Sequence, residues 1–225
     1  MKTPILPISV VSLACAGLVS GCGGSPAIGT ASNPQARVVD ALASPPSVSA
    51  SVDGSLIVGA STFGSVSSYQ VYSNGNRNII FTDAVAGTTL VNQTTLFQLN
   101  SFYTLIAYQS AGGPALLVLS DSNHASSVQG AIRFAKVAAG TTPIVDVYVT
   151  LPGASIASVS PTYSAVTLGS ANQPYVALAS GTYEVRETAN GSKAPLIDQQ
   201  VTLNGGTATT LLDDGTTTYL NLQDQ

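Results

Sequence analysis

Short runs in which apolar and polar residues alternate are the feature that most constrains the fold of this chain. Such runs recur throughout the sequence, for example at residues 37–42, 78–82 and 144–149. Successive side chains of a strand point to opposite faces of a sheet, so this period of two predicts half-buried strands. Asn-Gly and Asp-Gly pairs supply turns between the runs, and no stretch sustains the 3.6-residue apolar pattern of a helix. The sequence therefore predicts an all-β protein.

The chain repeats this organisation once. Residues 36–46 resemble residues 131–143, and each segment is followed by an alternating run, at 48–52 and at 145–149. Tandem similarity with two copies indicates duplicated domains rather than a solenoid, and units of about 90 to 100 residues suit an antiparallel sandwich. We therefore predict two tandem immunoglobulin-like antiparallel β-sandwich domains, at residues 36–122 and 123–225, with a linker near residues 121–127.

The first residues are typical of an export signal. Lys2 is followed by an apolar run over residues 5–19, which is shorter than the roughly 20 residues of a membrane span. Val19-Ser20-Gly21-Cys22 then resembles the lipobox of bacterial lipoproteins. The resemblance implies a signal peptide over residues 1–21, a diacylglycerol on the Cys22 thiol and a flexible Gly/Ser/Pro-rich tether over residues 22–35.

Two other interpretations of Cys22 are an ordinary secretory signal with a chance cysteine and a disulfide with Cys15. The disulfide would lose Cys15 together with the leader, so the mature chain depends on packing for its stability. A lipid anchor of two or three acyl chains holds a protein stably on a membrane, which would be its first partner. Gly23 stands where an aspartate would resemble an inner-membrane retention signal. We therefore expect a bacterial cell-envelope protein, lipid-anchored in the outer membrane.

Charge is sparse and evenly spread. Charged residues make up 8% of the sequence and hydrophobic residues 44%, a balance that argues against disorder. Beyond the leader, the basic residues form no cluster and the eleven acidic residues outnumber them. Nucleic-acid binding needs clustered cations along a phosphate track, so we do not expect a nucleic-acid partner.

Residues 133–149, RFAKVAAGTTPIVDVYV, resemble the opening of the bacterial domain-of-unknown-function family 4397. Residues 177–185 are similar to a later element of that family, and residues 63–69 and 101–107 of the first half resemble two more. Residues 49–53 depart from the family's V-D-V-Y-V strand. The resemblance implies an exported immunoglobulin-like sandwich, often lipid-anchored, and it brings no catalytic residues with it.

The strand around Asp146 and Tyr148 offers a candidate binding face. Alternation places Val145, Val147 and Val149 on the core side, and Asp146 and Tyr148 on the other side. A small polar and aromatic surface suits a sugar or a peptide. The alternative is structural: the aspartate accepts hydrogen bonds from a neighbouring turn, and the tyrosine covers a strand edge.

No catalytic constellation is recognisable. His124 is the single histidine and lies in the predicted linker, whereas a catalytic triad needs an oriented histidine beside a serine. Residues 213–215 lack the spaced carboxylates of a calcium loop and predict a turn between the last two strands. Glu184 and Glu187 have an odd spacing that places them on opposite faces of a strand, unlike a glycosidase pair. We therefore predict no enzyme, no cofactor and no metal site.

Three functions remain open. The first is a non-catalytic binding or structural module of the envelope, with an envelope protein or a glycan as partner. The second is a carbohydrate-binding or adhesive surface protein, which would expose aromatic side chains on one sheet face. The third is an unrecognised hydrolase, which would join Asp146, Tyr148 or His124 to a serine in a pocket.

Overall fold

The structure is a computed structural model that describes residues 31–121, 125–138, 140, 142–170 and 173–225. The predicted signal peptide, Cys22, most of the tether and His124 lie outside the described residues. Within the described ranges the chain forms sixteen strands: β1 (Gln35–Ala41), β2 (Val48–Val52), β3 (Ser55–Ser61), β4 (Gln70–Val71), β5 (Gly75–Asp83), β6 (Thr89–Phe97), β7 (Phe102–Ser110), β8 (Gly113–Ser120), β9 (Gln129–Lys136), β10 (Ile144–Thr150), β11 (Tyr163–Thr167), β12 (Val176–Ala179), β13 (Gly181–Ala189), β14 (Pro195–Leu203), β15 (Ala208–Asp213) and β16 (Leu220–Asp224).

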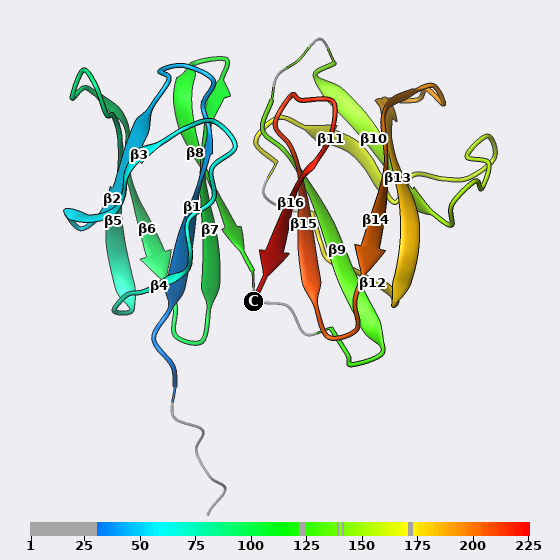
Figure 1. The fold of residues 1–225 in the computed structure, drawn as a ribbon, viewed down its shortest axis with the longest axis horizontal. Coiled ribbons are helices and arrows are strands. Elements are labelled where there is room, and N and C mark those ends of the chain that lie inside the picture. Colours follow the sequence, from blue (N-terminus) through cyan, green and yellow to red (C-terminus); the bar gives the residue numbers. More distant parts are fainter. Residues whose placement is uncertain (1–30, 122–124, 139, 141, 171–172) are drawn as a thin grey trace, which may run out of the picture. The chain divides into compact units, whose positions relative to one another are not determined.

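The strands form four sheets of four strands, and the second half repeats the first. The first half has the orders β4-β1-β7-β8 and β3-β2-β5-β6, and the second has β12-β9-β15-β16 and β11-β10-β13-β14 (Figure 1). Each strand of the second half therefore corresponds to the strand eight places earlier. The predictions of an all-β fold and of two tandem sandwiches are confirmed.

One strand pair in each half is parallel, which the prediction of antiparallel sheets did not include. β1 pairs with β7 and β9 pairs with β15 in parallel, and every other strand pair is antiparallel. Parallel neighbours need a long crossover connection, and here five intervening strands of the same half provide it. The first strand of each half therefore pairs with the seventh strand of that half.

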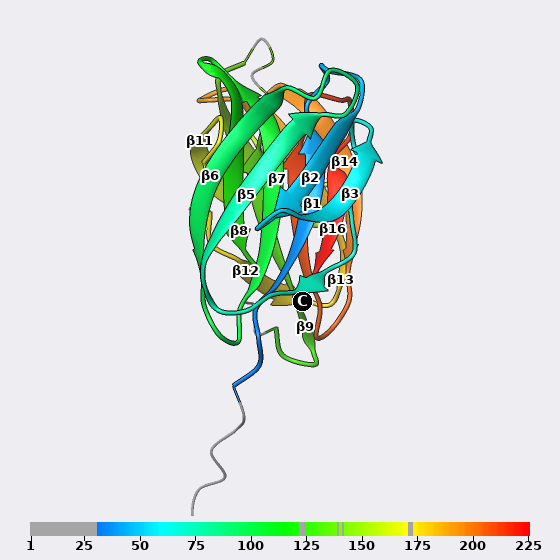
Figure 2. The same cartoon turned by 90° about the vertical axis from the view of Figure 1, so that its left-hand side faces the viewer.

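Each half has its own hydrophobic core between its two sheets. The first core includes Val38 and Leu105 from one sheet and Phe81 and Phe97 from the other. The second core includes Phe134 and Leu211 from one sheet and Val147 and Val185 from the other. The outer sheet of the first half, β3-β2-β5-β6, faces the viewer in Figure 2.

A third apolar cluster joins the two halves. Its members come from the inner sheets of both: Val39, Ala41, Ile106, Leu117, Leu119, Ala135, Val137, Leu212 and Leu222. Sheet β4-β1-β7-β8 therefore packs on sheet β12-β9-β15-β16, and β1 and β9 are buried on both faces. The described residues from 31 onward form one compact unit, with the predicted boundary at residues 122 and 123 falling between β8 and β9.

Candidate functional site

Asp146 on β10 lies where alternation placed it, on the side of the strand away from the core, but it is buried. Its carboxylate accepts hydrogen bonds from the backbone N–H groups of Ala165 and Gly191, each at 2.8 Å, and from the Asn190 side chain at 3.0 Å. Burial raises the pKa of Asp146, and these hydrogen bonds outweigh it and hold the pKa below its ordinary value. Ala165 has a positive φ of 51°, so the aspartate stabilises a left-handed residue in β11.

Tyr148 lies on the same side of β10 and is also buried. The Lys193 ammonium is 4.3 Å from the centre of its ring and donates a hydrogen bond to its hydroxyl at 2.9 Å. Asp146 therefore has the turn contacts of its structural alternative, and the buried Tyr148 is engaged by Lys193. Ligand binding by these two residues stays a prediction, and they line neither of the two cavities described below.

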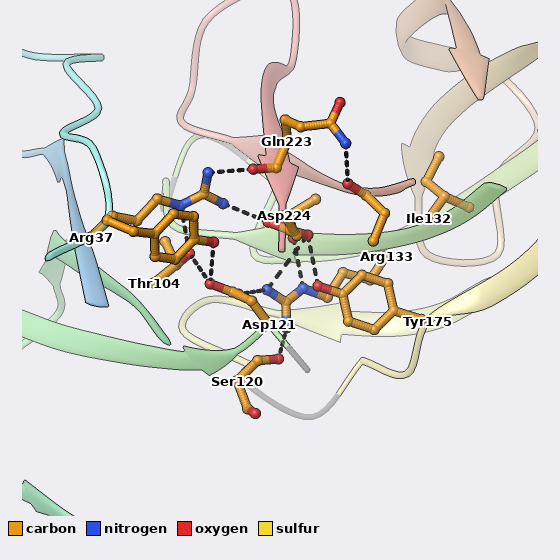
Figure 3. A network of polar contacts seen from close by, with 12 residues as sticks. Arg37, Thr104, Ser120, Asp121, Ile132, Arg133, Tyr175, Gln223 and Asp224 are labelled. Carbon is orange, nitrogen blue, oxygen red and sulfur yellow. Dashed lines mark hydrogen bonds and ion pairs between the residues drawn. The ribbon is translucent and has the colours of Figure 1, made fainter. Parts of the chain in front are cut away.

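A buried polar network spans the junction of the two inner sheets (Figure 3). Arg37 on β1 donates from Nε to the Thr104 hydroxyl of its own half at 2.9 Å. Its other two nitrogens reach the second half, where they donate to the Gln223 carbonyl at 2.6 Å and to Asp224 Oδ1 at 2.5 Å. One guanidinium of the first half thus binds the last strand of the second.

Arg133 on β9 makes the reciprocal set of contacts. It donates from Nε to Thr210 of its own half at 2.7 Å, to the Ser120 carbonyl at 2.6 Å and to the Asp121 carboxylate. Arg37 and Arg133 occupy equivalent places, because β1 pairs Arg37 with Thr104 and β9 pairs Arg133 with Thr210. The two halves therefore exchange equivalent arginines, as the subunits of a two-fold dimer do.

The two carboxylates of the network, Asp121 and Asp224, have equivalent hydrogen-bond donors in the two halves. Asp121 accepts hydrogen bonds from Thr104 at 2.6 Å and Tyr69 at 2.7 Å. Asp224 accepts them from Thr210 at 2.5 Å and Tyr175 at 2.6 Å. Burial raises the pKa of both tyrosines, so their hydroxyls stay protonated and donate. These charges are fully partnered, which indicates a structural role for the network.

A different polar cluster lies at one end of the second core. Lys136, the last residue of β9, donates a hydrogen bond to Asp213 at the end of β15, and its Nζ is 3.7 Å from Glu187 Oε1 on β13. The three side chains are each about 4% exposed. They line a cavity of about 170 Å³ that also includes the apolar side chains of Leu196 and Ile197.

Glu187 is the least satisfied member of this cluster. Its Oε2 is buried and has no hydrogen-bond partner, and the hydroxyl of nearby Tyr219 is also buried and without one. Burial and the charge of Asp213 raise the pKa of Glu187 to about 7, against the opposing charge of Lys136. The second core therefore contains a carboxyl that changes its charge near neutral pH.

A second, more apolar cavity of about 310 Å³ lies beside this cluster. It is lined by residues of both halves, among them Ala41, Phe63 and Val137, and by the β15–β16 loop at Asp214 and Gly215. The two cavities are adjacent, since Ala138, Gly215 and Thr216 line both. The predicted turn at residues 213–215 is present there.

The sequence contained one signal for the polar cluster that our prediction did not use. Alternation along β9 places Phe134 and Lys136 on the same face, and Phe134 is a core residue. A lysine on the core face needs a buried acidic partner, and Glu187 shares the core face of β13 with Val185. Which carboxylates meet Lys136 depends on packing between strands distant in the sequence.

The fold defines a tandem β-sandwich protein. The chain belongs to the family described as Domain of unknown function (DUF4397), which matches residues 34–148. The resemblance noted in the sequence is thereby confirmed. No curated protein matches the chain.

Among solved structures, the chain is similar to "CBMbc (family CBM26) from Eubacterium rectale Amy13K in Complex with Maltoheptaose". The identity is 11%, the TM-score is 0.26, and the match covers 79% of this chain and 91% of the other. A TM-score this low does not support a shared ligand. In the part of the chain that the structure describes, no helix is long and apolar enough to cross a membrane, and no group of three or more His, Cys, Asp or Glu side chains is placed to hold a metal ion.

Proposed function

We propose that this protein is a non-catalytic binding module of the bacterial cell envelope, anchored in the outer membrane through lipid on Cys22. The observation that carries the proposal is the reciprocal exchange of Arg37 and Arg133, because it joins two sandwiches into one unit and leaves the cavities at one end of it. Two sandwiches packed as one unit keep the residues that line a small cavity in fixed positions. Fixed lining residues suit the binding of a ligand.

The cavities lie at the end of the unit opposite the start of β1. Ala41, at the end of β1, lines the apolar cavity, whereas Gln35, at its start, is the last residue of the predicted tether. In Figure 1 the described chain begins at the lower end, and the β15–β16 loop lies at the upper end. A lipid anchor would raise the effective concentration of the module for a weak ligand in the envelope.

Two observations support binding over hydrolysis. Asp146 and Tyr148 are engaged by a turn and by Lys193, and neither cavity includes them. The family to which the chain belongs is of unknown function and supplies no reaction. The carbohydrate-binding alternative has less support, since all nine tyrosines are buried or half-buried and Phe63 is 37% exposed as a single ring.

The anchoring is tested by Cys22→Ser in cells labelled with palmitate. We expect the label and the membrane association to be lost, because the thiol that carries the lipid is gone. Undiminished label in this variant would end the lipoprotein proposal.

The binding role is tested with the lipid-free Cys22→Ser protein against envelope proteins and glycans. We expect a binder in this screen and an unchanged phenotype for His124→Ala in the lipidated protein. Loss of function in a His124→Ala protein that still folds and is still displayed would overturn the non-catalytic proposal and favour the hydrolase.

A further inference from the structure

The cavity at the end of the second core has an unbalanced set of charges. Two carboxylates, Glu187 and Asp213, share one ammonium, that of Lys136. Lys136 donates its close hydrogen bond to Asp213, so Glu187 receives only the longer contact at 3.7 Å. A buried carboxylate oxygen without a donor costs free energy, and Oε2 of Glu187 is such an oxygen. The site therefore lacks one positively charged donor.

The rest of the cavity wall combines apolar side chains with the threonines Thr142, Thr216 and Thr217. Leu196, which is 53% exposed, lies at the surface end, and Ile197 and Ala138 also line the space. The volume of about 170 Å³ is close to that of a cavity that holds one benzene molecule, roughly 150 Å³. An oligosaccharide does not fit such a space, whereas a short alkyl chain with one polar end does.

We propose that this cavity binds the ammonium end of an alkylamine, with Glu187 Oε2 accepting its hydrogen bond and Leu196 and Ile197 contacting its alkyl stem. The proposal rests on the binding role proposed above and names its ligand chemistry. A free diamine and a lysine side chain share this chemistry. A divalent metal ion fits the site less well, because two carboxylates beside the charge of Lys136 are too few ligands for it.

The first half supplies an internal contrast. Lys136 and Asp213 are paired in register on β9 and β15, and the equivalent pair on β1 and β7 is Asp40 and Ala107. Both oxygens of Asp40 are satisfied, Oδ1 by the Leu42 N–H at 3.0 Å and Oδ2 by the Ser61 hydroxyl at 2.9 Å. The first half therefore offers no open acceptor at this place, and we expect one amine site per chain.

Binding should depend on pH through Glu187. The groups that face it are Lys136 on β9, Asp213 on β15 and the Tyr219 hydroxyl after β15, with Asp198 on β14 acting on Tyr219. With a pKa of about 7, Glu187 is mostly ionised at pH 8 and mostly protonated at pH 6. An alkylamine stays charged at both values, since its pKa is near about 10.4. Its affinity should therefore fall by about tenfold from pH 8 to pH 6, in proportion to the ionised fraction.

The test uses the full chain with Cys22→Ser, so that no lipid is present, and n-butylammonium as the probe. Amide chemical shifts are followed at pH 8 and pH 6, with n-butanol as the neutral probe of the same length. We expect saturable shifts around β13 and β15 with n-butylammonium at pH 8, about tenfold weaker binding at pH 6, and no such shifts with n-butanol. Equal effects of the two probes, or pH-dependent shifts without any effect of the amine, would overturn the proposal.

Two variants locate the binding. Glu187→Gln should lose it, and Glu184→Gln is the matched control, because it makes the same change on the outer face of the same strand. Leu196→Trp keeps all three charges and narrows the surface end of the cavity, so it should weaken binding even if Glu187→Gln folds poorly. Undiminished binding in Leu196→Trp and in folded Glu187→Gln would refute the site.

The two sources of the amine are distinguished by comparing 1,5-diaminopentane with Nα-acetyl-lysine amide under the same conditions. Tighter binding of the diamine favours a free amine as the ligand, and tighter binding of the lysine derivative favours a side chain of a partner protein. Failure of all amines would leave the anchoring and the envelope-binding screen unaffected, so the two proposals can fail separately.

Discussion

The two halves of the chain share a strand order and an interface, yet they differ at one end of their cores. Each half contributes one arginine that binds a threonine of its own half and an aspartate of the other half, in the same strand positions. At the core end, the second half places Lys136, Glu187 and Asp213 together around a cavity.

The equivalent places in the first half are mostly apolar. Ala107 corresponds to Asp213 by register, and Phe81, which pairs with Ala50 on β2, corresponds to Glu187, which pairs with Val147 on β10. Phe81 and Ala107 belong to the first core. The same fold therefore closes this end of one half with apolar side chains and the buried carboxylate of Asp40, whereas the other half places three buried charged side chains there, and this difference points to a site.

Separating the two halves should have the largest effect. Residues 126–225 retain their own core and should unfold cooperatively, but they lose Arg37 as the partner of Asp224 and expose Leu212 and Leu222. We expect low stability and a concentration-dependent dimer in which Arg133 of each copy binds Asp224 of the other. Urea unfolding and sedimentation at several concentrations measure both effects.

A fragment without cooperative unfolding would show that the halves depend on one shared core. A fragment that stays monomeric at all concentrations would contradict the equivalence of the two interface faces. Arg133→Met in the fragment is the control, because it should abolish the dimer.

Removing either interface arginine should cost about 3 to 5 kcal/mol of unfolding free energy in the full chain, since it leaves a buried carboxylate without its cation. Arg133→Met should cost more than Arg37→Met, because Arg133 also lies 3.8 Å from Asp224. Urea unfolding measures the difference. Arg77→Met is the matched control: its ion pair with Asp53 is partly exposed, so its loss should cost under about 1 kcal/mol. Equal costs at all three positions would refute the structural role of the network.

Glu187→Gln should change how stability depends on pH. The pKa of Glu187 in the folded protein, about 7, lies above that of a free carboxyl, so the folded state holds the extra proton between these values. Wild-type stability should therefore fall as the pH rises from about 4.5 to about 7 and then level off. Urea unfolding at each pH gives the difference in unfolding free energy between wild type and variant. This difference isolates the contribution of Glu187. A constant difference across this range would show that Glu187 does not titrate there.

Ala165→Gly should have the smallest effect, a stabilisation of under about 1 kcal/mol. Ala165 has a positive φ of 51°, which glycine adopts without the steric cost of a Cβ, although glycine gives back part of the gain in the unfolded chain. Thermal unfolding detects the change. A destabilised variant would mean that the Ala165 methyl group contributes packing that outweighs its backbone strain.

The sequence by itself determined the local structure of this protein. Alternation defined the strands and placed Val145 and Val147 in the core opposite Asp146 and Tyr148, because side chains of a strand must point to alternate faces. The Asn-Gly and Asp-Gly pairs marked turns, as at Gly191 and Gly215, whose φ angles are positive. The duplication of the domain could be predicted from the sequence because both halves repeat the same strands.

Only the tertiary structure decided what covers each face. Alternation shows that Arg133 and Lys136 lie on opposite faces of β9, but it does not show that both faces are buried. The partner of Arg37 is Asp224, 187 residues away, and that of Lys136 is Asp213, 77 residues away. Such pairs form only when sheets pack on one another, because the period of a strand fixes the direction of a side chain and not the group that it meets.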